Sequence, residues 1–419
     1  MKKLFIWMLL PLVTWGCGGK GTPDPTPDPD PDPVVVTESV SGSFLQHWYA
    51  KGWTESRWNQ EMDVLKDAGM AYLIYSPVKE DDEDPDYASL EKCLKTAASH
   101  GIKVFVGCNA HDDWWDTSLS ASRLNGFMQD GITIAQEAYR RFHSKYPSSF
   151  YGWYWDWEVD NVNWGSRKQM LAEAWNITLD GLTALDGGMP LLFSPFMNPA
   201  YGTPAQYRDF WKSLFPMLHL RKGDVFAPQD CVGAKGLSTS TVKSWFYQLA
   251  DAAKTVDGLQ FWANIELFEQ YTVSAQDYFA TAPMTRMVQQ QEAVKSFVSR
   301  IICFSYTHYY SPYVVRDAYH TAYQAYLGDG SMPTPGTPGK VNTVNKEVGT
   351  GVALSWSMVS KADVDGFALY KNGKVLVKLQ VTQEDSFPDY FFDYEGKSSD
   401  SYQITTYNIV GNESSKVSF

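Results

Sequence analysis

Residues 150–158 read Phe150-Tyr-Gly-Trp-Tyr-Trp-Asp-Trp-Glu158, and residues 259–266 read Leu259-Gln-Phe-Trp-Ala-Asn-Ile-Glu266. Both stretches are apolar and rich in aromatic residues, and each ends at a glutamate. Short runs of this kind predict buried strands, and strands that alternate with helices predict a parallel β/α fold. A carboxylate at the C-terminal end of a parallel barrel strand lies on the face that carries the active site. Glu158 and Glu266 are therefore the candidate catalytic pair.

Eight such runs recur along the chain, with helix-like stretches between them, for example 55–68 and 87–99. The runs cover residues 42–49, 71–76, 103–109, 150–158, 191–198, 224–230, 259–266 and 301–306. Eight βα units in roughly 250 residues predict a (β/α)8 TIM barrel, here over residues 41–328, in which about 95 residues separate strand four from strand seven. Glu158 and Glu266 have a similar separation. The alternative is an open doubly wound sheet, but no glycine-rich phosphate loop follows the first run.

A second domain is expected beyond a proline-rich linker at residues 329–338. Residues 339–419 show short alternating strands and turns, including the hairpin signal Asn372-Gly373. This pattern predicts a small all-β, immunoglobulin-like sandwich. The segment resembles a fibronectin type III domain, in which Trp356 and Tyr402 match the places of a buried core tryptophan and a strand tyrosine.

The N-terminus predicts export. Residues 1–17 combine two lysines, a short apolar run and a cysteine after a glycine, which is a secretion signal that resembles a bacterial lipobox with Cys17 as the lipidated residue. Residues 18–40 form a Pro/Asp linker that favours an extended conformation. We expect a protein that is lipid-anchored to the bacterial outer membrane, at the cell surface or on the periplasmic face. Plain secretion is the alternative.

Composition excludes some partners. A net charge of -13 supplies no basic surface for nucleic acid. The cysteines at 93, 108, 231 and 303 lack metal-site spacing and predict buried free thiols. We expect no cofactor, a monomer, and membrane contact only through the lipid anchor. A metal at His111-Asp112-Asp113, with His47 or His308 as further ligands, is the alternative, but no zinc-protease motif supports it.

The two glutamates suit glycoside hydrolysis, which needs one carboxyl group to protonate the leaving oxygen and another to attack the sugar or activate water. In a retaining mechanism Glu158 would be the acid/base and Glu266 the nucleophile. Strand alternation places Asn264 on the same side as Glu266. It also places Asp156 below Glu158, where like-charge repulsion would raise the pKa of Glu158.

Further polar and aromatic side chains gather at the ends of the runs, where they could bind sugar hydroxyl groups or pack against a pyranose ring. Loop capping is the alternative role for each of them. The candidate substrate-binding residues are His47, Trp48, Asn109, His111, Asp160, Asn161, Asn198, Gln229, Asp230, Asn264, Tyr306, His308 and Tyr309.

Several of these runs together resemble the family called domain of unknown function 4434, over about residues 41–328. They are residues 41–46 with 53–54 and 66–69, residues 150–154 with 157–161, residues 227–230 with 232–233, and residues 304–306 with 309–312. The family is grouped with TIM-barrel glycosidases and is common in lipoproteins of glycan-degrading bacteria. The resemblance implies a carbohydrate substrate. Many retaining glycosidases have an asparagine before the strand-four glutamate, where this chain has Trp157.

Two other functions fit the same pattern. A glycan-binding surface lipoprotein without turnover would use the same aromatic residues but would not need a close acidic pair. A structural adhesion module would explain the sandwich but not the polar strand ends.

Overall fold

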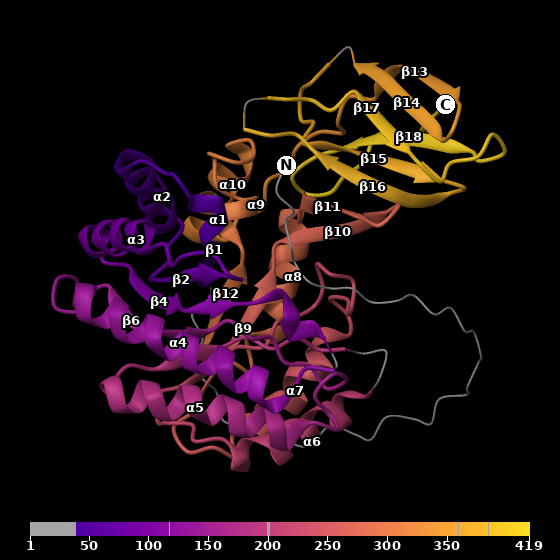
Figure 1. Cartoon of the computed structure of the whole chain (residues 1–419). Coiled ribbons are helices and arrows are strands. Elements are labelled where there is room, and N and C mark those ends of the chain that lie inside the picture. Colours follow the sequence, from indigo (N-terminus) through magenta and orange to yellow (C-terminus); the bar gives the residue numbers. More distant parts are fainter. Residues whose placement is uncertain (1–38, 117, 199–201, 359, 384) are drawn as a thin grey trace.

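The computed structural model describes residues 39–116, 118–198, 202–358, 360–383 and 385–419. It contains a parallel barrel and, beyond it, two antiparallel sheets (Figure 1). The predicted signal segment, Cys17 and nearly all of the first linker lie outside the described residues. No described helix has the length and apolarity needed to cross a membrane.

The predicted TIM barrel is confirmed. Eight parallel strands close into a barrel in the order β1-β12-β9-β8-β7-β6-β4-β2. The strands are β1 Val40–Gln46, β2 Tyr72–Ser76, β4 Lys103–Gly107, β6 Phe150–Trp155, β7 Leu191–Phe193, β8 Val225–Phe226, β9 Gln260–Glu266 and β12 Arg300–Phe304. In chain order β6 is barrel strand four and β9 is barrel strand seven. Glu266 therefore ends strand seven, and Glu158 follows strand four after two intervening residues.

Helices cover the outside of the barrel (Figure 1). They are α2 Glu55–Asp67, α3 Tyr87–His100, α4 Ala121–Phe142, α5 Lys168–Asp186, α6 Pro204–Leu214, α7 Val242–Ala253, α8 Met284–Val294 and α10 Ala318–Asp329. The Thr54 side chain caps α2 by accepting a hydrogen bond from the backbone of Arg57. Gly101 ends α3 with φ of 73°, which glycine adopts without strain. These local signals explain why the two helices expected at 55–68 and 87–99 agree with the structure.

Aromatic side chains fill the barrel interior. Phe44, Tyr154 and Trp262 belong to one buried cluster with residues from the other strands. The rings of Phe44 and Tyr154 meet edge to face at 5.2 Å. This cluster fills the interior of the barrel below the strand ends.

Several expected strands end earlier than predicted. β1 ends at Gln46, and His47 begins the short helix α1 His47–Ala50. β6 ends at Trp155, so that residues 156–158 already belong to a loop. Tyr306 begins helix α9 Tyr306–Tyr309, which the Ser305 side chain caps. The apolar runs continue past the strands because the loops at the barrel mouth also pack against apolar neighbours.

The C-terminal segment forms two sheets around one core. One sheet contains β13 Val341–Val348, β14 Val352–Met358 and β17 Tyr390–Asp393. The other contains β15 Gly366–Lys371, β16 Lys374–Gln380, β18 Tyr402–Tyr407 and β19 Val417–Ser418. Trp356 and Tyr402 are both buried in the shared core, as expected.

A hairpin from the barrel enters this core. Strands β10 Phe268–Val273 and β11 Gln276–Thr281 follow β9 directly. Tyr271 and Val273 of the hairpin lie in the same cluster as the core residues of the sandwich. Lys378 of β16 pairs with Glu269 of β10 at 2.7 Å. The sandwich is therefore packed on the barrel through the segment that follows Glu266, which the sequence did not predict.

Candidate active site

A cavity of about 150 Å³ lies at the mouth of the barrel, where the C-terminal ends of the strands meet. Its walls combine carboxylates with aromatic rings, the composition expected of a sugar site. The carboxylates are Glu80, Asp81, Asp112, Asp156 and Glu158, and the aromatic residues are Phe44, Trp48, Trp114, Trp115, Tyr154, Trp157, Phe268 and Phe304. Both features come from several strand ends, as in other barrel enzymes.

Glu158 lies in the cavity wall with a firmly held carboxylate. Gln229 donates a hydrogen bond of 2.7 Å from Nε2 to Oε1 of Glu158. Trp114 donates a hydrogen bond of 2.7 Å from its indole nitrogen to the backbone oxygen of Glu158. Burial raises the pKa of Glu158 to about 7, the hydrogen bond from Gln229 opposes the rise, and the charge of Asp160 adds to it. A carboxyl group with this pKa can donate a proton near neutral pH.

Asp156 lines the cavity two residues before Glu158. Burial raises its pKa to about 8, against hydrogen bonds from Ser76 and from backbone groups. A side chain at Gly107 would collide with this carboxyl group, so the glycine makes room for it. The expected repulsion between Asp156 and Glu158 is not what raises the pKa of Glu158, because a protonated Asp156 carries no charge at neutral pH. The like charge that contributes is that of Asp160.

Glu266 ends β9 but does not line the cavity. It is 1% exposed, and its Oε2 accepts a hydrogen bond of 2.8 Å from the backbone nitrogen of Ala234. A side chain at Gly233 would collide with Glu266. Its other oxygen, Oε1, is buried without a hydrogen-bond partner among the described residues. Burial, followed by the neighbouring Asp230, raises the pKa of Glu266 to about 8.

Asp230 and Gln290 hold the backbone of Glu266. Oδ1 of Asp230 accepts hydrogen bonds from the backbone nitrogens of Glu266 and Val232, at 3.2 and 3.1 Å. Gln290 donates to Oδ2 of Asp230 at 2.6 Å and to the backbone oxygen of Glu266 at 3.0 Å. Asp230 is fully buried outside the cavity wall. The structure thus places this predicted substrate-binding residue where it positions the end of strand seven.

Four of the predicted substrate-binding residues line the cavity: Trp48, His111, Gln229 and Asn264. Asn264 donates a hydrogen bond of 3.0 Å to Ser194 inside the barrel, as the alternation of β9 predicts. His111 also caps a turn, since its Nδ1 accepts a hydrogen bond from the backbone of Asp113.

The other predicted residues lie away from the cavity wall. Asn109 donates a hydrogen bond to the backbone oxygen of Phe127, and the Asp160 carboxylate accepts hydrogen bonds from residues 162 and 163 of its own loop. Asn161 is hydrogen-bonded to the backbone of Asn198. The remaining members of this group are His47, Tyr306, His308 and Tyr309, all buried. Such side chains fix the loops at the barrel mouth.

His308 illustrates this role. Its ring lies 4.3 Å from that of Tyr49, and its Nε2 accepts a hydrogen bond of 3.4 Å from the backbone nitrogen of Gln46. Burial lowers its pKa to about 3, so the ring is neutral at physiological pH. The neutral ring supports the first loop of the barrel.

Sequence reasoning missed several cavity residues. Gln46 and Ser76 are the last residues of β1 and β2, and both line the cavity. Their position at a strand end was the available signal. Glu80 ends the short strand β3 Lys79–Glu80, which pairs with β5 Asn109–Ala110, and Asp81 follows it. Their cavity position depends on this pairing outside the barrel sheet.

In the described part of the chain, no group of three or more His, Cys, Asp or Glu side chains is arranged to hold a metal ion. The four described cysteines are free thiols, with Cys108 partly buried and the other three buried. Acid/base chemistry by carboxyl groups is what the arrangement of residues around the cavity supports.

A TIM barrel with carboxyl groups and aromatic rings at its mouth is the architecture of many glycoside hydrolases. This chain belongs to the family described as "Domain of unknown function (DUF4434)", whose model matches residues 40–315. The resemblance inferred from the sequence is thereby confirmed.

The fold is shared with the first of the following three solved structures, while the other two align at TM-scores below 0.5. A protein described as a "putative alpha-L-fucosidase" from Bacteroides thetaiotaomicron VPI-5482 aligns with a TM-score of 0.57 and 17% identity, over 73% of this chain and 99% of that one. A glycosyl hydrolase family 2 member from Bacteroides cellulosilyticus DSM 14838 aligns with a TM-score of 0.40 and 13% identity, over 91% of this chain and 46% of that one. A beta-glucuronidase from Bacteroides uniformis aligns with a TM-score of 0.41 and 11% identity, over 91% of this chain and 45% of that one. No curated protein matches the chain.

Proposed function

We propose that this protein is a glycoside hydrolase that acts on a polysaccharide or oligosaccharide at the bacterial cell surface. The observation that carries the proposal is Glu158, a carboxyl group with a raised pKa that is held by Gln229 in the wall of an aromatic cavity. The fold shared with a protein described as a "putative alpha-L-fucosidase" supports a glycoside as substrate.

In this mechanism Glu158 protonates the glycosidic oxygen as the leaving group departs. Its pKa of about 7 leaves a large part of the carboxyl groups protonated at neutral pH. After departure the ionised Glu158 takes a proton from the attacking water, as microscopic reversibility requires. Aromatic rings such as Trp48 and Trp115 would pack against the sugar.

The second carboxyl group of the proposed mechanism is Glu266, as nucleophile in a retaining reaction. It ends strand seven, which lies on a different side of the barrel from strand four, so a Glu266 side chain turned into the cavity would approach the sugar from another direction than Glu158. Asp156 cannot do this as readily, because it leaves the same strand end as Glu158. Binding of substrate would have to draw the Glu266 carboxyl group from the Ala234 amide toward the cavity and favour its ionised form, because burial raises its pKa to about 8.

The burial of Glu266 also favours a second candidate function. The Glu266 carboxyl group is 1% exposed and accepts a hydrogen bond from a backbone amide, an arrangement that stabilises a loop. If it stays there, the cavity binds a glycan without cleaving it, and the protein is a glycan-binding surface lipoprotein.

A panel assay separates these two functions. The purified protein is incubated with polysaccharides and aryl glycosides, reducing ends are measured, and binding is measured in parallel by calorimetry. Turnover of a polysaccharide by the wild type that is lost in Glu158→Gln supports the hydrolase. Tight binding of a glycan without turnover supports the binding protein.

Location is part of the proposal. The apolar run that ends at Cys17 and the Pro/Asp tract after it support a lipid-anchored monomer held away from the outer membrane. Cys17→Ala should move the protein from the membrane fraction to the soluble fraction. Equal membrane association of the variant would place the anchor elsewhere.

A further inference from the structure

Strand β17 carries a row of aromatic side chains on the outside of the C-terminal sandwich. Tyr390 is 55% exposed and Tyr394 is 66% exposed, the two highest values among the large apolar side chains of the described residues. Phe392 lies between them, and its ring meets that of Tyr394 edge to face at 4.7 Å. Alternate positions of a strand face the same side. These three residues therefore form one surface, named here the aromatic platform.

Small side chains beside the aromatic platform leave its rings uncovered. On β14, Ala353 lies opposite Phe392 and Ser355 lies opposite Tyr390. A side chain at Gly351 would collide with the ring of Phe392, so the glycine lets that ring lie against the backbone. The rings can therefore be reached by a flat ligand.

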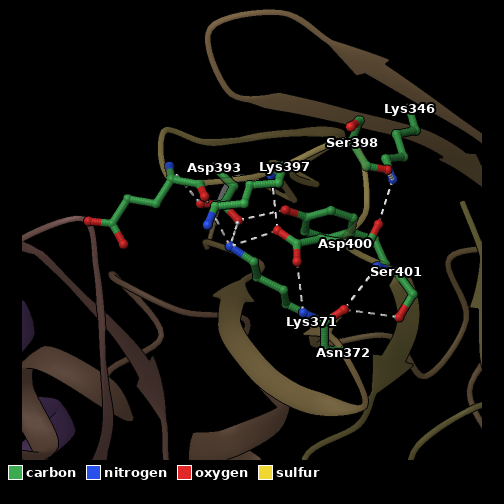
Figure 2. Close-up of polar contacts among 10 residues, drawn as sticks. Lys346, Lys371, Asn372, Asp393, Lys397, Ser398, Asp400 and Ser401 are labelled. Atoms are coloured by element: carbon green, nitrogen blue, oxygen red, sulfur yellow. Dashed lines mark hydrogen bonds and ion pairs between the residues drawn. The ribbon is translucent and has the colours of Figure 1, made fainter.

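A buried polar network fixes the end of the aromatic platform (Figure 2). Asp393 is 1% exposed, accepts a hydrogen bond of 2.7 Å from the hydroxyl group of Tyr402 and pairs with Lys371 at 2.9 Å. The same carboxylate accepts a hydrogen bond of 3.1 Å from the backbone nitrogen of Glu395. Tyr394 thus lies between two backbone positions that the network holds.

Asp400 extends the network through the connection between β17 and β18 (Figure 2). It pairs with Lys371 at 3.3 Å and accepts hydrogen bonds from Asn372 at 2.8 Å and from the backbone of Lys397 at 2.9 Å. A surface that is ordered before binding loses little conformational entropy when a ligand arrives. Such rigidity suits a binding surface better than a mobile loop.

The side chains at the outward strand positions beside the aromatic platform favour a neutral ligand. The outward positions of β13, which are paired through β14 to the platform, carry Thr343, Asn345 and Glu347. They supply hydroxyl, amide and carboxylate groups, and the outward positions of β13, β14 and β17 contain no lysine or arginine. A uronate or sulfate ligand would need cations. Aromatic faces beside hydroxyl, amide and carboxylate groups instead match the C–H faces and hydroxyl groups of a neutral sugar.

The aromatic platform is connected to the cavity through the hairpin β10–β11. Phe268 begins β10 and lines the cavity. The rings of Tyr278 on β11 and Phe391 on β17 lie 5.6 Å apart. Burial, and after it the nearby Tyr394, raise the pKa of Tyr278. The hairpin therefore runs from the cavity wall to the core of the sandwich that carries the platform.

We propose that Tyr390, Phe392 and Tyr394 form a second glycan-binding face, specific for a neutral polysaccharide and separate from the cavity. The choice of a glycan as ligand rests on the proposed function of the barrel. The face would hold a polymer close to the site that acts on it, which raises the local concentration of substrate.

Affinity electrophoresis tests the proposal with the full chain. The gels contain a mixed-linkage β-glucan, xylan, galactomannan or starch as neutral polymers, and polygalacturonate as an acidic one. The variants are Tyr390→Ala/Tyr394→Ala, Glu158→Gln and, as a matched control, Tyr247→Ala, which removes an exposed tyrosine from α7 of the barrel. Melting temperatures within a few degrees of wild type verify that each variant folds.

We expect at least one neutral polymer to retard the wild type, Tyr247→Ala and Glu158→Gln alike. The double variant should bind that polymer at least about ten-fold more weakly, since two exposed rings are lost. No retardation by any neutral polymer, equal retardation of the double variant, or retardation by polygalacturonate alone would each overturn the proposal. Hydrolysis is measured separately, so retardation without turnover would refute the proposed function and leave the second binding face supported.

Discussion

Gln229 donates its side-chain amide to Glu158 at 2.7 Å and so joins the loop after barrel strand six to the loop after strand four. The same amide nitrogen also donates to the backbone oxygen of Ser194 at 2.9 Å, which fixes its orientation. Gln229 therefore controls both the position and the acidity of the proposed acid. The hydrogen bond stabilises the ionised form of Glu158, and it therefore partly offsets the rise in pKa that burial causes.

Gln229→Leu should move the alkaline limb of the pH–activity profile upward. The substitution removes the hydrogen bond that favours the ionised form, so the pKa of Glu158 should rise above about 7. The measurement is kcat/KM between pH 5 and 9. Ser76→Ala, which removes a hydrogen bond to Asp156 instead, is the control whose alkaline limb should stay in place. If the alkaline limb does not move in Gln229→Leu, that limb does not report the ionisation of Glu158.

Glu266→Gln should lower turnover by at least about a thousand-fold, because the amide cannot attack the anomeric carbon. Asp156→Asn should retain most activity, since Asp156 follows the same strand end as Glu158 and is not placed to attack from another side of the sugar. Both variants are assayed on the same aryl glycoside. The reverse result, with Asp156→Asn inactive and Glu266→Gln active, would assign the second carboxyl role to Asp156.

Glu266→Gln should also make stability less dependent on pH. The folded pKa of Glu266, about 8, lies above the ordinary value of 4.5, so the folded state holds this proton more tightly than the unfolded state. The resulting stabilisation is complete below pH 4.5 and is lost as the pH rises through about 8. The variant should therefore gain in melting temperature relative to wild type between pH 5 and 9. A constant difference across that range would argue against a buried, protonated Glu266.

The barrel and the sandwich should unfold together. Tyr271 of the barrel hairpin is 8% exposed within the core of the sandwich. Tyr271→Ala should cost about 3 kcal/mol, as for other large aromatic residues cut to alanine in a core. Calorimetry should show one transition at a lower temperature, whereas Tyr247→Ala should change stability by less than about 0.5 kcal/mol. Two separate transitions in the wild type would show that the domains unfold independently.

The eight strands were predictable because each consists of a short apolar run that a turn or helix signal closes. Strand alternation also predicted the side of the strand on which Asn264 lies, and the structure places its side chain inside the barrel. The ends of the runs were harder to place. Residues at 47–49 and 156–158 remain apolar or aromatic beyond the last barrel hydrogen bond, because the loops pack on one another.

The site was only partly predictable. Glu158, Gln229 and Asn264 line the cavity as expected, since each lies at or just beyond a strand end. Asp160 and Asp230 instead turn toward backbone amides, and the sequence does not specify which way a loop carboxylate points. The hairpin that joins the sandwich to the segment after Glu266 depends on long-range packing, for which no local pattern exists.

The most direct measurement compares wild type and Glu158→Gln on two glycosides of the same sugar, one with a nitrophenyl leaving group and one with a sugar leaving group. If Glu158 is the general acid, the variant should retain most of the rate of glycosidic bond cleavage on the nitrophenyl glycoside, because that leaving group needs little protonation. On the sugar-linked substrate it should lose turnover by a factor of about a hundred or more. Equal losses on both substrates, or no turnover of either by the wild type, would contradict the central claim.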